Sequence, residues 1–191
     1  MLNLVLFGPP GAGKGTQSEK IIDKYDLVHF STGDLFRKHI GEGTDLGRMA
    51  QEYIDYGNLV PDALVIKMVE VKIRSHAHAN GFIFDGFPRT VAQAEELDKM
   101  LARKSMEIKL MIALEVQDDE LRTRLRLRGK TSGRTDDQDD EKINNRIKVY
   151  KEETLPVANY YKKQSKYSGI NGVGRIDDIF NTICMSIDLV K

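Results

Sequence analysis

The stretch LNLVLFGPPGAGKGTQ, residues 2–17, decides how the rest of this chain is interpreted. Residues 2–7 are apolar apart from Asn3 and have the length of a buried strand. Residues 8–15 then hold four glycines, two prolines and one lysine, at the point where a helical pattern over 14–24 begins. Glycine and proline are poor helix formers. Their presence here indicates that the backbone conformation of this segment, rather than helix formation, has the functional role.

That purpose follows from the spacing. Gly8 to Lys14 fits the pattern G-x-x-x-x-G-K of a phosphate-binding loop. Glycines let backbone N–H groups close around phosphate oxygens, and the N-terminus of the next helix adds its positive end. An ordinary Gly/Pro turn is the alternative, which the flanking strand and helix disfavour. Gly15 follows the lysine where Ser or Thr is usual, and Thr16 comes one place later, which leaves a direct contact between a hydroxyl and Mg²⁺ open.

Composition limits the classes of function. The 191 residues suffice for one domain with a core, and 29 basic residues balance 29 acidic ones. A net charge of zero gives no field that attracts nucleic acid or a membrane surface. One cysteine, Cys184, excludes an internal disulfide and a cysteine-based zinc site. No run is apolar over the length of a membrane span, and no leader sequence precedes the first strand, so we expect a cytoplasmic protein.

Short apolar runs alternate with helical patterns along the chain. Strands are predicted at 2–7, 28–31, 81–85 and 108–114, with a weak fifth within 168–175. Helices are predicted at 14–24, 34–40, 45–56, 62–79, 90–103, 118–128, 140–164 and 177–190. This alternation predicts an α/β fold, a parallel sheet flanked by helices. Residues 31–60 have no strand pattern and are interpreted as a helical insertion, and polar residues 129–139 as an exposed mobile loop. The methionines assigned to the core are Met49, Met68, Met100 and Met111.

A second group of polar residues follows the other strands. Asp85 and Arg89 come directly after one buried strand, and Thr32 follows another, with Asp34 expected to cap the next helix. Ligands of open α/β sheets bind at the carboxyl ends of the strands, so these residues should gather near the phosphate loop. Arg37, one turn into the insertion, is either part of this group or a solvated helix charge.

A third group is basic. Arg124 and Arg128 share one helix face and Arg122 and Arg126 another, so only one pair can line a site. Such a run of arginines usually lies on a solvated surface. The chain has no Ser/His/Asp arrangement, and an acceptor that is itself a phosphate needs no general base, because its second pKa is about 6. Transfer between two phosphates needs charge shielding and in-line approach instead.

Five motifs in order carry a resemblance to a known family. They are GPPGAGKGTQ, STGDLFR, GNLVP, DGFPRTVAQ and LRLRGKTSGRTDD, and together they span about residues 4–180. The chain resembles the adenylate kinases, in the short-lid form. The resemblance implies the P-loop nucleoside monophosphate kinase fold with a five-stranded parallel sheet in a single domain. Its core would comprise residues 1–30, 61–127 and 139–191, with an NMP-binding insertion at 31–60 and a short lid at 128–138. The lid has no cysteines, so no zinc is expected.

The resemblance also assigns residues. ATP would contact Gly11, Ala12, Gly13, Lys14, Gly15, Thr16, Arg128 and, most weakly, Gly174. AMP would contact Thr32, Arg37, Asn58, Leu59, Val60, Gly86, Phe87, Pro88, Arg89, Gln93, Arg134 and Arg146. The catalytic set would be Lys14, Asp85, Arg89, Arg124, Arg128, Arg134 and Arg146. Asp85 would order water around Mg²⁺, with Thr16 as a second candidate ligand.

The implied reaction is reversible transfer from MgATP to AMP, giving two ADP, by a monomer that closes over its substrates. Adenylate kinase is itself a standard example of such lid closure, and Gly129 and Gly133 are either its hinges or parts of helical turns. Thr32, where pyrimidine kinases typically have Ala, and the Gln93 amide favour AMP as acceptor. The alternatives are a uridylate or cytidylate kinase and a non-catalytic module that senses ATP.

Overall fold

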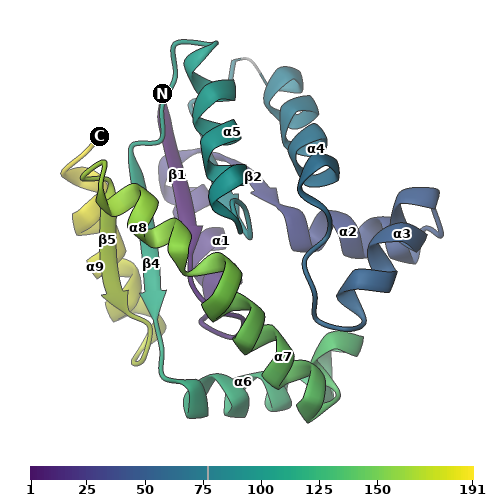
Figure 1. The fold of residues 1–191 in the computed structure, drawn as a ribbon. Helices are drawn as coiled ribbons and strands as arrows, with labels where there is room; N and C mark the ends of the chain where they lie inside the picture. The colour runs from purple at the N-terminus through teal and green to yellow at the C-terminus, as the bar shows by residue number, and fades with distance from the viewer. Residues whose placement is uncertain (77) are drawn as a thin grey trace.

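A parallel sheet forms the centre of the molecule (Figure 1). The computed structural model describes residues 1–76 and 78–191. Within them the strands lie in the order β2-β3-β1-β4-β5, and every pairing is parallel. Their bounds are β1 Leu2–Phe7, β2 Val28–Ser31, β3 Gly81–Asp85, β4 Leu110–Glu115 and β5 Tyr167–Asn171. The predicted α/β class and five-stranded sheet are confirmed.

Side chains alternate across the sheet and so build two cores. In β1, Leu4 and Leu6 face one cluster while Val5 and Phe7 face the other. The first cluster lies under α1 (Lys14–Tyr25) and α9 (Ile176–Asp188), which pack on each other. The second lies under α4 (Asp62–Ser75), α5 (Val91–Ala102) and α8 (Pro156–Lys162). Burial on both faces explains why the central strands are mostly apolar rather than alternating between apolar and polar residues.

The strand order places the end of β1 at a crevice. β1 lies between β3 and β4, with Leu6 opposite Asp85 and Phe7 opposite Ala113. The chain therefore leaves the sheet in opposite directions on the two sides of β1, which is where open α/β sheets bind ligands. Ser31 pairs with Asp85 at the end of β2, so three strand ends meet at this edge.

Two arms extend beyond that edge (Figure 1). One consists of α2 (Thr32–Gly41) and α3 (Asp45–Ile54), packed on each other. The other consists of α6 (Asp118–Ser132), a 3₁₀ turn at Thr135–Asp137 and α7 (Asp140–Val149). The arms touch, because Thr135 Oγ1 donates to Asp55 at 3.0 Å and Asn145 Nδ2 donates to the Tyr56 carbonyl at 2.6 Å.

The segment 129–139 was predicted to be an exposed loop; most of its residues are exposed, but most of it is helical. Helix α6 continues to Ser132, and Gly133 ends it with a φ of +64°. Gly129 lies inside the helix, where a Cβ would come within 2.3 Å of the Asp137 carbonyl oxygen. Asp136 and Asp137 are buried, because arginines neutralise them. The absence of a side chain at Gly129 therefore allows α6 to pack closely against the backbone of Asp137.

The predicted helix at 140–164 is interrupted by a π turn at Tyr150–Thr154. The Leu155 N–H donates to the Tyr150 carbonyl at 2.7 Å, five residues back. Pro156 follows directly and has no N–H to continue an α-helical pattern, so the turn widens. Two residues of this turn, Tyr150 and Thr154, reach the pocket described below.

Three smaller predictions differ from the structure. Met49 is 56% exposed rather than in the core, whereas Met100 and Met111 are buried. The cap of α2 is Ser31, whose hydroxyl accepts from the Asp34 N–H, so Asp34 lies in the first turn. The predicted helix at 62–79 ends at Ser75, and its residue 77 lies outside the described residues.

Candidate active site

A pocket of about 470 Å³ lies at the carboxyl edge of the sheet, between the two arms. Its walls come from the phosphate loop, the turn after β3, the insertion, and helices α6 and α7. The predicted site residues that line it are Gly11, Ala12, Gly13, Lys14, Gly15, Thr16, Thr32, Arg37, Asn58, Leu59, Val60, Asp85, Gly86, Phe87, Pro88, Arg89, Gln93, Arg124, Arg128, Arg134 and Arg146. Gly174 does not line it. The binding and catalytic roles assigned to these residues stay predictions.

The phosphate loop has the backbone that its glycines predict. Gly8 has a φ of +145°, and a Cβ there would lie 2.8 Å from the Leu114 carbonyl oxygen. Gly13 is left-handed and caps α1 without a side chain, so the first N–H groups of the helix are free for an anion. Lys14 Nζ donates to the Gly8 and Pro9 carbonyls at 2.8 and 3.0 Å, which holds it against the loop.

Burial lowers the pKa of Lys14 to about 8, and the nearby charge of Asp85 opposes the shift only in part. Arg89, Arg128 and Arg146 lower it further, since they add positive charge around the ammonium. The positive charges that line the pocket therefore outnumber the carboxylates that line it. Such a field favours a bound polyanion.

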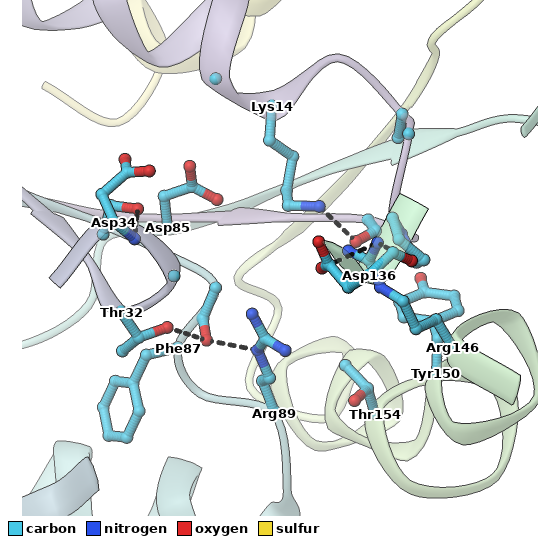
Figure 2. A pocket seen from close by; sticks show the side chains of 18 of the residues that line it. Lys14, Thr32, Asp34, Asp85, Phe87, Arg89, Asp136, Arg146, Tyr150 and Thr154 are labelled. Atoms are coloured by element: carbon cyan, nitrogen blue, oxygen red, sulfur yellow. Dashed lines mark hydrogen bonds and ion pairs between the residues drawn. The ribbon is translucent and has the colours of Figure 1, made fainter. Parts of the chain in front are cut away.

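The turn after β3 joins a carboxylate and a guanidinium (Figure 2). Asp85 ends the strand and is 8% exposed. The Gly86 carbonyl accepts hydrogen bonds from Thr32 Oγ1 and from Arg89 Nε, each at 2.8 Å. Burial, then the charge of Arg146, lowers the pKa of Arg89 to about 10, and the guanidinium stays charged at neutral pH. Two side chains from different elements are thereby fixed by one backbone oxygen.

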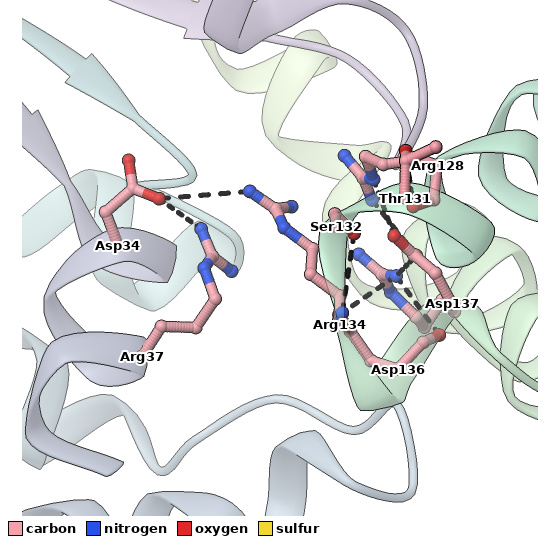
Figure 3. A network of polar contacts seen from close by, with 9 residues as sticks. Asp34, Arg37, Arg128, Thr131, Ser132, Arg134, Asp136 and Asp137 are labelled. Atoms are coloured by element: carbon pink, nitrogen blue, oxygen red, sulfur yellow. Dashed lines mark hydrogen bonds and ion pairs between the residues drawn. The ribbon is translucent and has the colours of Figure 1, made fainter. Parts of the chain in front are cut away.

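Two arginines on the opposite side share a buried carboxylate (Figure 3). Arg128 donates to both oxygens of Asp137, at 2.5 and 3.0 Å. Arg146 also pairs with Asp137, and with Asp136 at 2.9 Å. Burial opposes the charge of Asp137, but the hydrogen bond from Arg128 and the charge of Arg146 outweigh it and lower its pKa. These carboxylates hold the arginines beside the pocket.

A further carboxylate, that of Asp34, lies between the arms. Asp34 pairs with Arg37 on its own helix and lies 4.0 Å from Arg134 of the other arm (Figure 3). Burial opposes ionisation of Asp34, but hydrogen bonds from Arg37 and Ser31 lower its pKa nonetheless. Arg37 is therefore part of the site wall and not only a solvated helix charge.

The structure resolves which arginine pair of α6 faces the pocket. Arg124 lines it, donates to Glu120 at 2.7 Å and reaches the Gly172 carbonyl at 3.1 Å. Arg122 and Arg126 face away, pairing with Asp119 and Asp140 respectively. The pocket thus receives Arg124 and Arg128, the pair that the resemblance selects.

Sequence reasoning missed the acidic partners. Asp136 and Asp137 are in a polar stretch that has the composition of a loop. The signal that could have found them is the cluster of arginines itself, because guanidinium groups that converge without ligand need carboxylates between them. Tyr150 and Thr154 were missed because the π turn that aims them into the pocket has no recognisable pattern.

The pocket offers oxygen donors suited to Mg²⁺. The Asp85 carboxylate and the exposed Thr16 hydroxyl both lie on its wall. Magnesium typically keeps several waters and takes one or two carboxylates together with substrate phosphates. Over residues 1–76 and 78–191, three or more His, Cys, Asp or Glu side chains are nowhere grouped to hold a metal. The donors that are present fit an ion that arrives with a nucleotide.

Comparison with known proteins agrees with the geometry. The family model described as "Adenylate kinase" matches residues 6–166. The chain belongs to the adenylate kinase family. A relative named "Adenylate kinase" from Flavobacterium psychrophilum is 54% identical over 179 residues, covering 94% of both chains. One of the same name from Bacteroides thetaiotaomicron is 51% identical over 188 residues, 98% of this chain and 99% of the relative.

A further bacterial relative is similar over most of the chain. The "Adenylate kinase" of Mycolicibacterium smegmatis is 48% identical over 179 residues, 94% of this chain and 95% of the relative. The resemblance in the five motifs is therefore confirmed, and the protein is a nucleoside monophosphate kinase, a phosphotransferase. Among the described helices, none combines the length and apolar character needed to cross a membrane.

Proposed function

We propose that this adenylate kinase family member transfers a phosphoryl group reversibly from MgATP to AMP, giving two ADP, by charge shielding without a general base. One observation carries the proposal. A single pocket contains a phosphate loop and, on other elements, a second set of cations formed by Arg37, Arg89 and Arg134. A protein that only sensed ATP would need the first set alone.

The phosphate loop and Lys14 would bind the ATP phosphates. Backbone N–H groups at the start of α1 would donate to the anion, and the Lys14 ammonium would leave the Gly8 and Pro9 carbonyls for the transferred group. Arg124 and Arg128 would add charge from the lid side. Together they would neutralise the repulsion between donor and acceptor, which is the main barrier to contact between two polyanions.

The acceptor would lie against the turn after β3 and the insertion. Arg37, Arg89, Arg134 and Arg146 would hold its phosphate, and the base would lie near Thr32, the backbone of Asn58 to Val60, and Gln93. The acceptor phosphate is largely ionised at neutral pH, so no side chain needs to remove a proton. Mg²⁺ bound to ATP would neutralise further phosphate charge, with Asp85 ordering its water shell.

Arginines and carboxylates would exchange partners as substrates arrive. Asp34, Asp136 and Asp137 hold Arg37, Arg128 and Arg146 in place now. A phosphate is a stronger partner than a carboxylate, since it carries more charge and more acceptor oxygens. Contacts between the arms, such as Thr135 with Asp55, are already made without substrate and would belong to a closed state that excludes water. A monomer would suffice for this reaction, because one chain supplies the whole pocket. We place the protein in the cytoplasm.

The test is to mix the protein with MgATP and each of AMP, UMP, CMP and GMP, and to follow phosphorus NMR. ADP from AMP alone, stopped by EDTA, is expected. Turnover of UMP or CMP instead would keep the mechanism and overturn the acceptor. Bound ATP without transfer to any acceptor would favour the sensor.

A substitution separates the role of Lys14 from its effect on folding. Lys14→Met should lose turnover by several orders of magnitude while the circular dichroism spectrum is kept, since one charge is removed from the site and no core side chain changes. A variant that retained a tenth of wild-type turnover would contradict the role given to this lysine.

A further inference from the structure

Asp62 makes two hydrogen bonds that the reaction itself does not require. It is the first residue of α4 and does not line the pocket. Its Oδ1 accepts the Gln93 Nε2–H at 2.6 Å, and its Oδ2 accepts the Thr90 hydroxyl at 2.9 Å. Thr90 in turn caps α5 by accepting the Gln93 backbone N–H. The carboxylate is therefore fixed in orientation against one end of the Gln93 amide.

The other end of that amide is fixed as well. Gln93 Oε1 accepts the Arg89 backbone N–H at 2.7 Å, and the side chain lines the pocket with 1% of the residue exposed. A carboxylate can only accept and a backbone N–H can only donate. The amide nitrogen must therefore face Asp62 and the oxygen must face Arg89. If the amide were turned over, its oxygen would face the Asp62 carboxylate, acceptor against acceptor, and its NH2 group would face the Arg89 N–H, donor against donor.

A fixed amide presents one pattern to a purine. After these bonds, Gln93 keeps one N–H and one carbonyl lone pair. Adenine offers a donor at its 6-amino group and an acceptor at N1, whereas hypoxanthine and guanine offer an acceptor at O6 and a donor at N1. An amide that can turn over accommodates both patterns, while an amide held in one orientation matches only one of them.

We propose that Asp62 is a positioning residue that determines acceptor specificity: by locking the orientation of the Gln93 amide, it makes the site discriminate a 6-amino purine monophosphate from a 6-oxo one. This inference rests on the proposed function, in which the acceptor base lies against Gln93. Asp62 acts through Gln93 and touches no substrate.

The test compares AMP with IMP, because these acceptors differ only at the 6-position and N1 and not in bulk at position 2. In Asp62→Asn the new amide can donate as well as accept, so one of the two locks on Gln93 is released. The ratio of kcat/KM for AMP to that for IMP should fall about tenfold, the lower end for a hydrogen bond to a charged group. The change should reside in KM, since the base is remote from the transferred phosphoryl group, and kcat at saturating AMP should change by less than about twofold.

Asp98→Asn is the matched control. Asp98 lies on α5, the helix of Gln93, and its carboxylate accepts Tyr160, Tyr161 and Gln164 at 2.8, 3.3 and 3.0 Å. It does not line the pocket. The same substitution there loosens a comparable network, and the AMP/IMP ratio should stay at the wild-type value. A fall only in Asp62→Asn supports the proposal; an unchanged ratio in that variant, or an equal fall in both, overturns it.

A second variant covers a failure to fold. Asp62→Ser places a short polar side chain in the first turn of α4, and its hydroxyl both donates and accepts, so the same fall in the ratio is expected. The wild type separates the two proposals. A wild type without AMP turnover overturns the proposed function and this inference together, whereas AMP turnover with an unaltered ratio in the variants overturns the inference alone.

Discussion

ATP affinity should fall as pH rises through about 8, because Lys14 loses its proton there in the empty site. Burial and three arginines lower this pKa from the ordinary 10.5, and Asp85 compensates only in part. Bound phosphates restore negative charge around the ammonium and keep it protonated. Binding at high pH must therefore take up a proton, whereas binding at low pH starts from a lysine that is already charged.

The magnitude follows from the two protonation states. With a pKa of about 8, about nine-tenths of the molecules carry the charge at pH 7 and about one-tenth at pH 9. The Kd for ATP should therefore rise about tenfold between these pH values. The second pKa of a phosphate is about 6, so ATP itself stays ionised throughout. Proton uptake on binding should rise from about 0.1 to about 0.9 per site over the same range.

Isothermal titration calorimetry, with ATP and no acceptor, in two buffers of different ionisation enthalpy measures both quantities. Lys14→Arg should flatten the pH dependence, because a guanidinium keeps its charge over this range. Lys67→Arg, on the exposed side of α4, is the control and should retain the wild-type slope. A Kd constant within twofold from pH 7 to 9, or the wild-type slope in Lys14→Arg, would refute the reasoning.

Three further substitutions probe the pocket. Thr32→Ala removes the hydroxyl that donates to Gly86 at 2.8 Å, and should lower the preference for AMP over UMP about fivefold in kcat/KM; equal ratios in variant and wild type would exclude the role. Asp137→Asn leaves two arginines without their buried carboxylate, and should lower the free energy of unfolding, measured in urea, by about 3 kcal/mol. An unchanged free energy of unfolding would show that these ion pairs do not stabilise the fold. Gly57→Ala introduces a Cβ 2.7 Å from Arg146 Cγ at a φ of +74°; it should cost about 1–2 kcal/mol, seen as a lower melting temperature, and raise the KM for AMP.

The sheet and the phosphate loop could be predicted from the sequence because both depend on local pattern. Buried parallel strands are apolar at nearly every position, as in β1, whose one polar residue is Asn3, and the glycines of the loop are required by the backbone itself. The fifth strand, Tyr167–Asn171, was placed only approximately, because it includes Ser168 and Gly169 and is largely half-buried or exposed. The pattern of an edge strand is weaker for that reason.

Side-chain partners could not be predicted, because they depend on tertiary contacts. The polar run at 129–139 has a loop's composition, yet Asp137 has a fully buried side chain, since Arg128 and Arg146 converge on it from two helices. The lock on Gln93 likewise joins Asp62 to a residue 31 positions later. Composition cannot distinguish a solvated carboxylate from a buried one when the compensating charge is distant in the sequence.

The Gly86 carbonyl constrains how this enzyme can evolve. One oxygen accepts Thr32, from the arm that would select the base, and Arg89, which would hold the acceptor phosphate. A mutation that shifts this turn to admit a new base should also move the arginine, so we expect a gain in substrate range to come with a loss of turnover. Variants with altered acceptors should therefore arise first at positions that leave this carbonyl in place.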